Sequence, residues 1–351
     1  MELRKKTREV KIGNLKMGAD NPILIQSMLN TKNGDVKAAI EQSIALKNAG
    51  CDIVRLAVTD EASISCVREL KKAVDIPLVA DIQFDFRLAL DAISAGIDKI
   101  RINPGNIGSD ERVKAVVKKA KERNIPIRIG VNTGSVHPSV LEKYKTVCPE
   151  ALAEEAMRHV KILEENDFSD IVISIKASSV PLMIDSYKLI SEKVDYPLHL
   201  GVTEAGTEYL GTLKSAVGIG SLLSQGIGDT IRVSLTADPV REIYAAKDIL
   251  KSLELIKSGP TLVSCPTCAR CTVNLIDIAN EVTERLKNVD KNIKVAVMGC
   301  VVNGPGEARD ADIGITGAKG EGLIFKKGEI IRKVPENEIV SALFEEIDKL
   351  D

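Results

Sequence analysis

The first 235 residues of the chain alternate between short apolar runs and longer amphipathic stretches. The apolar runs are four to seven residues long, which is the length of buried strands. Each run is followed by a stretch with apolar residues three and four positions apart, such as Val36–Ala49 or Glu111–Arg123, which indicates a helix. The expected strands are Ile23–Met28, Ile53–Val58, Leu78–Gln83, Lys99–Pro104, Ile127–Asn132, Ile171–Lys176, Leu198–Glu204 and Thr230–Leu235.

Strands and helices that alternate in this order form parallel βα units. Eight such units within about 235 residues match the strand number and the length of a TIM (β/α)8 barrel. An open, doubly wound sheet is the alternative, and the regular repeat favours closure into a barrel. Barrel enzymes carry their active sites at the carboxyl ends of the strands, so the residues there are the first candidates for a functional site.

The pattern changes after a long helical stretch at Asp238–Leu255, because the glycine and proline of Lys257–Pro260 break the helix. We therefore expect a barrel domain at 1–258 and a second domain at 259–351. The expected elements of the second domain are a helix at Thr272–Lys287, strands at Ile293–Met298, Asp312–Thr316, Glu321–Phe325 and Ile330–Lys333, and a final helix at Glu336–Leu350. This mixture predicts a small α+β domain.

The composition of the chain excludes several classes of protein. A formal net charge of −2 over 351 residues gives no reason to expect a nucleic-acid partner. No apolar run approaches the roughly 18 residues that span a bilayer. The charged start of the chain does not resemble a secretory signal. The seven cysteines, an odd number, therefore indicate the reducing cytoplasm and metal or catalytic use.

Charged residues occupy the carboxyl ends of the expected strands. The cations there are Arg55, Arg101, Arg128, Lys176 and Arg232. The acids that could pair with them are Asp81, Asp85 and Glu204, so the cations are in surplus. Internal ion pairing is one interpretation. The favoured one is a site for a doubly charged anion such as phosphate, because bidentate arginine suits phosphate and buried charges need partners. The expected substrate-binding residues are Arg55, Asp81, Arg101, Asn103, Arg128, Asn132, Lys176, Arg232 and Ser234.

Four cysteines stand in the second domain, at Cys265, Cys268, Cys271 and Cys300. Thiolates select zinc or iron–sulfur clusters. The C-x2-C-x2-C run resembles the ferredoxin pattern, whereas structural zinc sites usually pair two C-x-x-C knuckles and Cys300 stands alone. A redox-active dithiol at Cys265 and Cys268 would leave Cys300 unexplained. An iron–sulfur cluster is favoured, with Glu307 as the fourth ligand and Cys271 as its rival, unless Cys271 faces away on the helix expected to start there.

The chain closely resembles the bacterial 4-hydroxy-3-methylbut-2-enyl diphosphate synthase family of the non-mevalonate isoprenoid pathway. The motifs that carry the resemblance cover nearly the full length; they are Ile25–Met28, Val79–Ile82, Arg101–Gly108, Ile129–Asn132, His199–Gly206, Ser264–Cys268 and Gly299–Glu307. The resemblance implies a TIM barrel followed by a domain with one [4Fe–4S] cluster per subunit, bound by Cys265, Cys268, Cys300 and Glu307.

The resemblance also implies an activity. Enzymes of this family reductively open 2-C-methyl-D-erythritol 2,4-cyclodiphosphate and expel water, with electrons from flavodoxin or ferredoxin. It implies that Arg55, Arg101, Arg128 and Lys176 bind the diphosphate, and that the enzyme is a head-to-tail homodimer. Glu204 is the candidate acid for the departing hydroxyl group, kept protonated by partial burial; the alternative is that it only forms an ion pair.

Two other functions fit parts of the sequence. Lys176 at the end of a barrel strand could be the Schiff-base lysine of an aldolase or isomerase with a zinc-bound second domain. The second domain could instead be a structural metal module that only mediates association.

Overall fold

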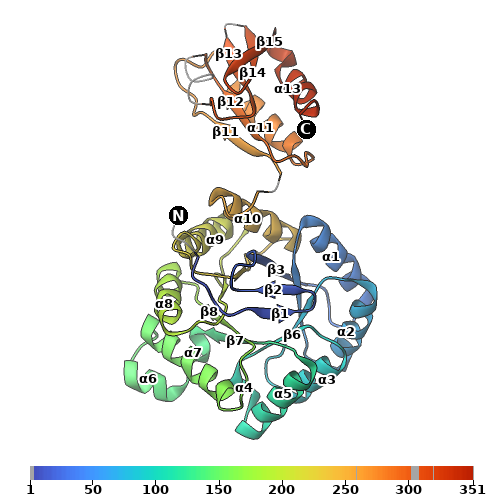
Figure 1. Cartoon of the computed structure of the whole chain (residues 1–351), viewed down its shortest axis with the longest axis vertical. Coiled ribbons are helices and arrows are strands. Elements are labelled where there is room, and N and C mark those ends of the chain that lie inside the picture. The colour runs from blue at the N-terminus through green and yellow to red at the C-terminus, as the bar shows by residue number, and fades with distance from the viewer. Residues whose placement is uncertain (1–3, 258, 302–307, 319, 351) are drawn as a thin grey trace. The chain divides into compact units, whose positions relative to one another are not determined.

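The computed structural model describes residues 4–257, 259–301, 308–318 and 320–350. It forms two compact units, Met1–Leu253 and Glu254–Asp351, and each is described by itself (Figure 1). The boundary expected after residue 258 falls just inside the second unit. No helix in the described ranges is long and apolar enough to cross a membrane.

The first unit is a barrel of eight parallel strands. The strands are β3 (Leu24–Met28), β4 (Ile53–Ala57), β5 (Leu78–Asp81), β6 (Lys99–Ile102), β7 (Ile127–Asn132), β8 (Ile171–Lys176), β9 (His199–Leu200) and β10 (Thr230–Ile231). They lie in the order β8-β7-β6-β5-β4-β3-β10-β9. A parallel bridge between Ile173 and Leu198 brings β8 next to the segment before β9, so the ring is nearly closed. The TIM barrel predicted from the sequence is confirmed.

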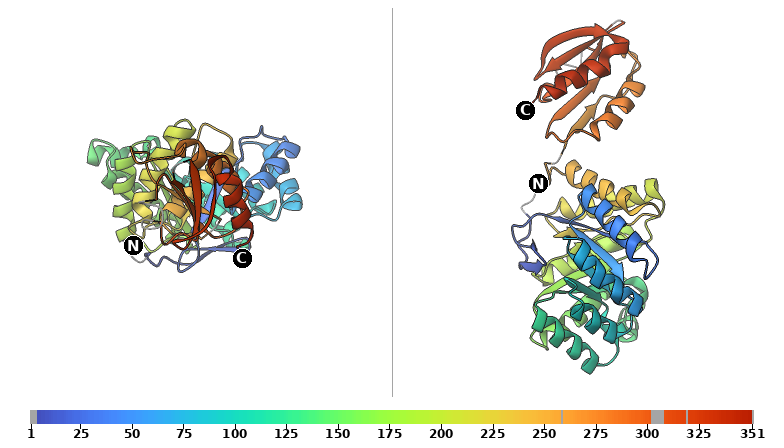
Figure 2. Two further views of the ribbon diagram at one scale, coloured as in Figure 1. Left: turned by 90° about the horizontal axis from the view of Figure 1, so that it is seen from above. Right: turned by 90° about the vertical axis from the view of Figure 1, so that its right-hand side faces the viewer.

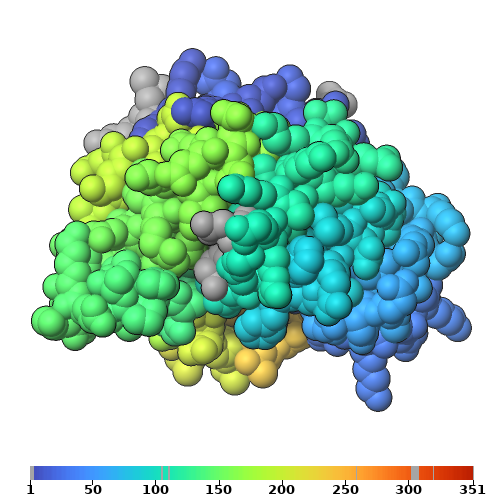
Figure 3. Space-filling view, turned by 90° about the horizontal axis from the view of Figure 1, so that it is seen from below, coloured from blue at the N-terminus to red at the C-terminus, as the bar shows by residue number. Residues whose placement is uncertain are grey.

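Helices form the outer layer of the barrel, as Figures 1 and 2 show. They are α1 (Val36–Ala49), α2 (Glu61–Ala73), α3 (Phe86–Ser94), α4 (Pro104–Ile107), α5 (Asp110–Arg123), α6 (Pro138–Tyr144), α7 (Pro149–Glu164), α8 (Val180–Lys193), α9 (Glu208–Leu223) and α10 (Pro239–Ser252), with a 3-10 turn at Thr133–Ser135. Figure 3 shows this layer from one side, with α3 and α5 in cyan to teal and α6 in green.

Local sequence explains where these helices begin and end. The carboxylate of Asp35 accepts a hydrogen bond from the backbone N–H of Ala38 and caps α1, which ends at Gly50 with a φ of 95°. Asp60 and Ser63 form a reciprocal capping box at the start of α2. Caps of this kind fix the lengths of the loops that join strands to helices, and these loops surround the barrel mouth.

An N-terminal hairpin, which the sequence analysis did not anticipate, closes one end of the barrel. Its strands are β1 (Val10–Ile12) and β2 (Leu15–Met17), paired antiparallel. Val10, Ile12 and Met17 are buried against side chains near the amino ends of the barrel strands, among them Leu24 and Ile53. The hairpin therefore fills the amino end of the barrel with apolar side chains.

The second unit is a small α+β domain, as predicted. Its mixed sheet has the order β11 (Thr261–Ser264), β12 (Lys294–Met298), β13 (Ile313–Ala318), β14 (Glu321–Lys326) and β15 (Glu329–Pro335). The first three strands are parallel and the last three antiparallel. Residues of α11 (Leu275–Leu286) and α13 (Ile339–Asp348) share a core with side chains of β12 and β13, and a 3-10 turn at Glu336–Glu338 precedes α13.

Candidate active site

The barrel interior holds the charged residues expected at the strand ends. Ile53 packs with the N-terminal hairpin inside the barrel, and successive side chains of a strand point to opposite faces. Arg55, two positions further along β4, therefore points inward as well. The register of the neighbouring strands sets Asp81 beside Arg101 and Arg101 beside Arg128. The parallel strands thus gather one carboxylate and three guanidinium groups.

Asp81 is the acid at the centre of this group. It is buried, and its two oxygens lie 2.6 Å from Nη2 of Arg55 and 3.1 Å from Nη1 of Arg101. Burial acts to raise the pKa of Asp81, but Arg55 and Arg101 outweigh it and hold that pKa at about 2. Asp81 is therefore a carboxylate at any physiological pH, and it fixes two arginines that the sequence analysis assigned to substrate binding.

Arg128 and Lys176 remain without an acidic contact in the described part of the chain. Arg128 is 1% exposed, and its Nε and Nη1 have no hydrogen-bond partner among the described residues. Burial, with Arg55 and Arg101 nearby, lowers the pKa of Arg128. Burial, followed by Arg232 and the other arginines, lowers the pKa of Lys176 well below its ordinary value. Both cations would be stabilised by an anion entering the barrel mouth.

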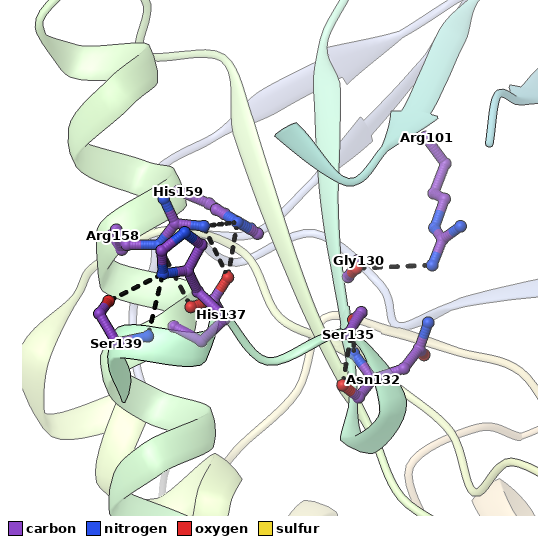
Figure 4. Close-up of polar contacts among 9 residues, drawn as sticks. Arg101, Gly130, Asn132, Ser135, His137, Ser139, Arg158 and His159 are labelled. Atoms are coloured by element: carbon purple, nitrogen blue, oxygen red, sulfur yellow. Dashed lines mark hydrogen bonds and ion pairs between the residues drawn. The ribbon is translucent and has the colours of Figure 1, made fainter. Parts of the chain in front are cut away.

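The guanidinium group of Arg101 reaches from β6 to Gly130 of β7 (Figure 4). Its Nη2 is 3.5 Å from the carbonyl oxygen of Gly130, and a Cβ atom at Gly130 would overlap its Nε. The amide of Asn132, on the same face of β7, reaches 3.2 Å from Nη2 of Arg101 when its oxygen faces the guanidinium group. Glycine at position 130 therefore makes room for an arginine that spans two strands.

The remaining residues expected to bind substrate lie around the same mouth. Asn103 is buried just beyond β6, and its carbonyl oxygen accepts a hydrogen bond of 2.8 Å from the backbone N–H of Asn106. Arg232 follows β10; its Nη1 is 3.6 Å from Sδ of Met28. Ser234 is partly buried two residues later.

The structure argues against internal pairing by two of the acids, and it contradicts the expected partial burial of Glu204. Asp85 does not face the mouth cations: it caps α3, and its carboxylate is 2.8 Å from Nη2 of Arg87. Glu204 is exposed rather than partly buried, and it forms no ion pair with any described residue. Its φ of 52° lies in the left-handed region that side chains other than glycine seldom adopt. Of the three acids, only Asp81 pairs with the cations of the mouth.

Sequence reasoning missed three polar residues buried with this group: Lys99, His199 and Glu242. Lys99 is two positions before Arg101 on β6, so strand alternation could have placed it inside the barrel. Glu242 shares a face of α10 with the buried residues Ala245 and Ile249. A charged residue at helical spacing within an apolar face could have identified it as buried.

The second unit brings its four cysteines to one cavity of about 100 Å³. Cys265, Cys268, Cys271 and Cys300 line it together with Pro266, Arg270 and Gly299. Cys265 follows β11 directly, and its Sγ accepts a hydrogen bond of 3.2 Å from the backbone N–H of Gly299. Parallel pairing of β11 with β12 therefore brings the two cysteine segments together.

The four cysteines of this cavity suit a thiolate-bound group, either a zinc ion or an iron–sulfur cluster. Zinc–thiolate bonds of about 2.3 Å hold the sulfurs of one site in mutual contact. Among the described residues, no three cysteine, histidine or acidic side chains are close enough to hold one metal ion. A cubane cluster spreads its thiolate ligands over a wider cage, which a cavity lined by four cysteines can accommodate.

The structure bears on the two rivals for the fourth ligand position differently. Glu307 lies outside the described residues. Cys271 precedes α11 by several residues, so it does not face away on that helix. Its Sγ donates to the carbonyl oxygen of Val273 at 3.2 Å, and the sulfur also lies against Gly299. Cys271 therefore lines the same cavity as the three expected ligands.

Comparison with solved structures shows the fold of the barrel unit. The dihydropteroate synthase of Stenotrophomonas maltophilia is 13% identical, with a TM-score of 0.52 over 71% of this chain and 97% of that one. The dihydropteroate synthase of Yersinia pestis is also 13% identical, with a TM-score of 0.50 over 71% of this chain and 99% of that one. At this identity the likeness concerns the fold alone.

Comparison with families and curated relatives covers both units. Residues 7–247 match the GcpE TIM-barrel domain, and residues 261–349 match the GcpE protein C-terminal domain. The protein named 4-hydroxy-3-methylbut-2-en-1-yl diphosphate synthase (flavodoxin) from Clostridium acetobutylicum is 62% identical over 99% of both chains. The protein of the same name from Caldanaerobacter subterraneus is 57% identical over 100% of this chain and 99% of the other. The chain therefore belongs to the GcpE family, the family of these diphosphate synthases.

Proposed function

We propose that the chain reductively opens 2-C-methyl-D-erythritol 2,4-cyclodiphosphate. The substrate takes up two electrons and two protons, and it yields (E)-4-hydroxy-3-methylbut-2-enyl diphosphate and one water molecule. Reduced flavodoxin is the proposed donor, since the relatives are named for it. The proposed site of action is the cytoplasm, where cysteines remain reduced.

The observation that carries this proposal is the surplus of buried cations in the barrel mouth. Asp81 neutralises part of the charge of Arg55 and Arg101, whereas Arg128 and Lys176 have no acidic contact among the described residues. A cyclic diphosphate supplies the missing negative charge. The same cations would stabilise the charge that develops on the diphosphate oxygen when its bond to carbon breaks.

The second unit is the proposed place of the [4Fe–4S] cluster. Cys265, Cys268 and Cys300, with Glu307 as the fourth ligand, would hold it. When bound, the cluster supplies electrons one at a time, which no protein side chain can do. The thiols need only be deprotonated and free to approach the iron; backbone and side-chain hydrogen bonds from Arg270 lower the pKa of Cys268 toward that state.

Glu204 is the proposed acid for the departing hydroxyl group. Glu204 is exposed at the mouth, and its own backbone φ is 52°. Its carboxyl group is therefore free to reach a bound substrate. Glu204→Gln should keep substrate affinity and lose most turnover. Near-normal turnover in that variant would remove Glu204 from the mechanism.

The activity is tested with anaerobically purified protein, reduced flavodoxin and the cyclic diphosphate. We expect formation of the linear diphosphate and a brown protein with about four irons per chain. A colourless protein that holds one zinc ion and forms no product would refute the proposal.

The head-to-tail homodimer is also a proposal, and mixing of variants tests it. Arg128→Met removes a barrel cation, and Cys268→Ser removes an exposed thiol of the second unit. If the barrel of one subunit works with the cluster of the other, each mixed dimer has one working site of two, so a 1:1 mixture of the two inactive variants should regain about a quarter of the wild-type activity. No regain after subunit exchange, shown separately with tagged chains, would argue that each chain works alone.

A further inference from the structure

The first and last strands of the barrel pair over a short distance. β10 pairs with β3 only through Thr230 with Leu24 and Ile231 with Ile25. The segment that follows, residues 232–235, contacts the end of β3 through Arg232, whose Nη1 lies 3.6 Å from Sδ of Met28. It carries Arg232 and Ser234, both expected to bind substrate. On its other side, the backbone N–H of Arg232 still donates to the carbonyl oxygen of Leu200 at 2.9 Å.

We call the junction between β3 and the segment of residues 232–235 the seam of the barrel. The carboxylate of Glu242 bridges this seam from outside the barrel. Glu242 lies on α10, and only 3% of its surface is exposed to solvent. Its Oε2 accepts a hydrogen bond of 2.7 Å from the hydroxyl of Ser27 on β3. Its Oε1 accepts one of 3.0 Å from the backbone N–H of Leu235 and lies 3.6 Å from Nη2 of Arg232. One oxygen therefore holds the first strand, and the other holds the segment after the last.

We propose that Glu242 is a positioning residue that joins the two edges of this seam and orients Arg232 toward the diphosphate. The inference rests on the proposed function, because it assigns Arg232 to the substrate of that reaction. It adds a residue that touches no substrate itself and acts through the arginine.

The contacts of Arg232 explain why it depends on this carboxylate. Its Nη1 has a sulfur neighbour, Sδ of Met28, at 3.6 Å, and its Nε has no hydrogen-bond partner among the described residues. Glu242 is the acid in contact with it within the described chain. Without that negative charge, the guanidinium group would lose the contact that sets its direction, while its other donors would still be available to an anion.

Glu242→Gln separates charge from shape. Glutamine keeps an acceptor for the N–H of Leu235 and can donate to the hydroxyl of Ser27, but it carries no charge. We expect the loss of the contact that orients Arg232 to outweigh the added positive charge of the mouth, so inorganic diphosphate should bind about tenfold more weakly by calorimetry. The KM for the cyclic substrate should rise about as much, with kcat changed less than about threefold. Ser27→Ala keeps the charge of Glu242 and removes only its hydrogen bond to β3, so its effect on diphosphate affinity should be smaller. It serves as the second variant if the Glu242→Gln protein does not fold.

The decisive measurement is a double-mutant cycle with Arg232→Ala. If Glu242 acts through Arg232, Glu242→Gln should weaken diphosphate binding little further when Arg232 is already alanine. Additive losses would overturn the inference, as would wild-type affinity in the single variant. Glu155→Gln is the matched control: Glu155 is also a buried helical acid, 2.9 Å from Arg158, but it lies outside the mouth, so affinity should not change.

The two proposals can fail separately. Diphosphate binding that shows the expected coupling, in a protein that does not convert the cyclic substrate, would refute the proposed function alone. Conversion with additive losses would refute the role of Glu242 alone. A wild-type protein that binds neither ligand would refute both.

Discussion

The charged residues of the barrel stand on paired strands, whereas the cysteines of the second unit stand on the loops that follow strands. Asp81, Arg101 and Arg128 are placed by the register of three neighbouring strands, and Asp81 is already paired. Cys268 is exposed, and the described cysteines do not converge on one metal ion. The barrel site is therefore organised by the fold, and the cysteine site would acquire its final geometry from the cluster that it is proposed to bind.

The largest effect should follow from removing a cysteine. Cys300→Ser takes away a buried thiol of the cavity, so iron should be lost and turnover should fall more than about 1,000-fold, because the cofactor carries the electron chemistry. Iron analysis and the visible spectrum measure the loss. The barrel should still bind inorganic diphosphate with wild-type affinity; if that affinity also falls, the two regions are not built independently.

Removing the unpaired arginine should lower function without lowering stability. Arg128→Met deletes a buried cation that has no acidic contact among the described residues, so turnover should fall about 100-fold. The urea midpoint of the barrel should stay the same or rise, because burying an unpaired charge is unfavourable. A large drop in that midpoint would show that Arg128 stabilises the fold without a ligand.

Removing the paired carboxylate should destabilise the barrel. Asp81→Asn leaves Arg55 and Arg101 buried without their partner, at an expected loss of roughly 3 to 5 kcal/mol in the free energy of unfolding. The native pKa of about 2 lies below the ordinary value of 3.8, so the carboxylate stabilises the fold above about pH 4. That contribution is lost as pH falls from about 4 to about 2. Urea titrations at several pH values should show this slope in the wild type and a shallower one in the variant.

The smallest effect is expected at Cys271. If Glu307 is the fourth ligand, Cys271→Ser should keep its iron and its activity within about twofold, because serine preserves the volume at this partly buried position. Cys148→Ser, in the barrel unit, is the matched control. Loss of iron in the first variant but not in the second would assign the fourth position to Cys271.

The sequence predicted those parts of the molecule that follow local patterns. The strands Ile127–Asn132 and Ile171–Lys176 lie where apolar runs placed them. The expected strands Leu198–Glu204 and Thr230–Leu235 are instead reduced to His199–Leu200 and Thr230–Ile231. Their shortening could not be predicted locally, because the length of a strand depends on how far its neighbours in the ring pair with it.

The candidate site was predictable in its charges but not in its pairing. Strand alternation identified Arg55, Arg101 and Arg128, since a cation in an apolar run stands out. Which acids would meet them depends on loop geometry, so Asp85 and Glu204 were expected at the mouth and do not pair there. The hairpin of β1 and β2 was missed because its three-residue strands give too little alternation to read.

The hairpin of β1 and β2 determines from which end of the barrel ligands can enter and leave the proposed site. Val10, Ile12 and Met17 fill the amino end of the barrel, so this end offers no exit. In the proposed reaction, the cyclic diphosphate would therefore enter through the mouth at the carboxyl ends of the strands. The linear product and the released water would leave through the same mouth. The product must then dissociate before another substrate can bind. Any obstruction of the mouth would lower the rate of substrate binding and the rate of product release together.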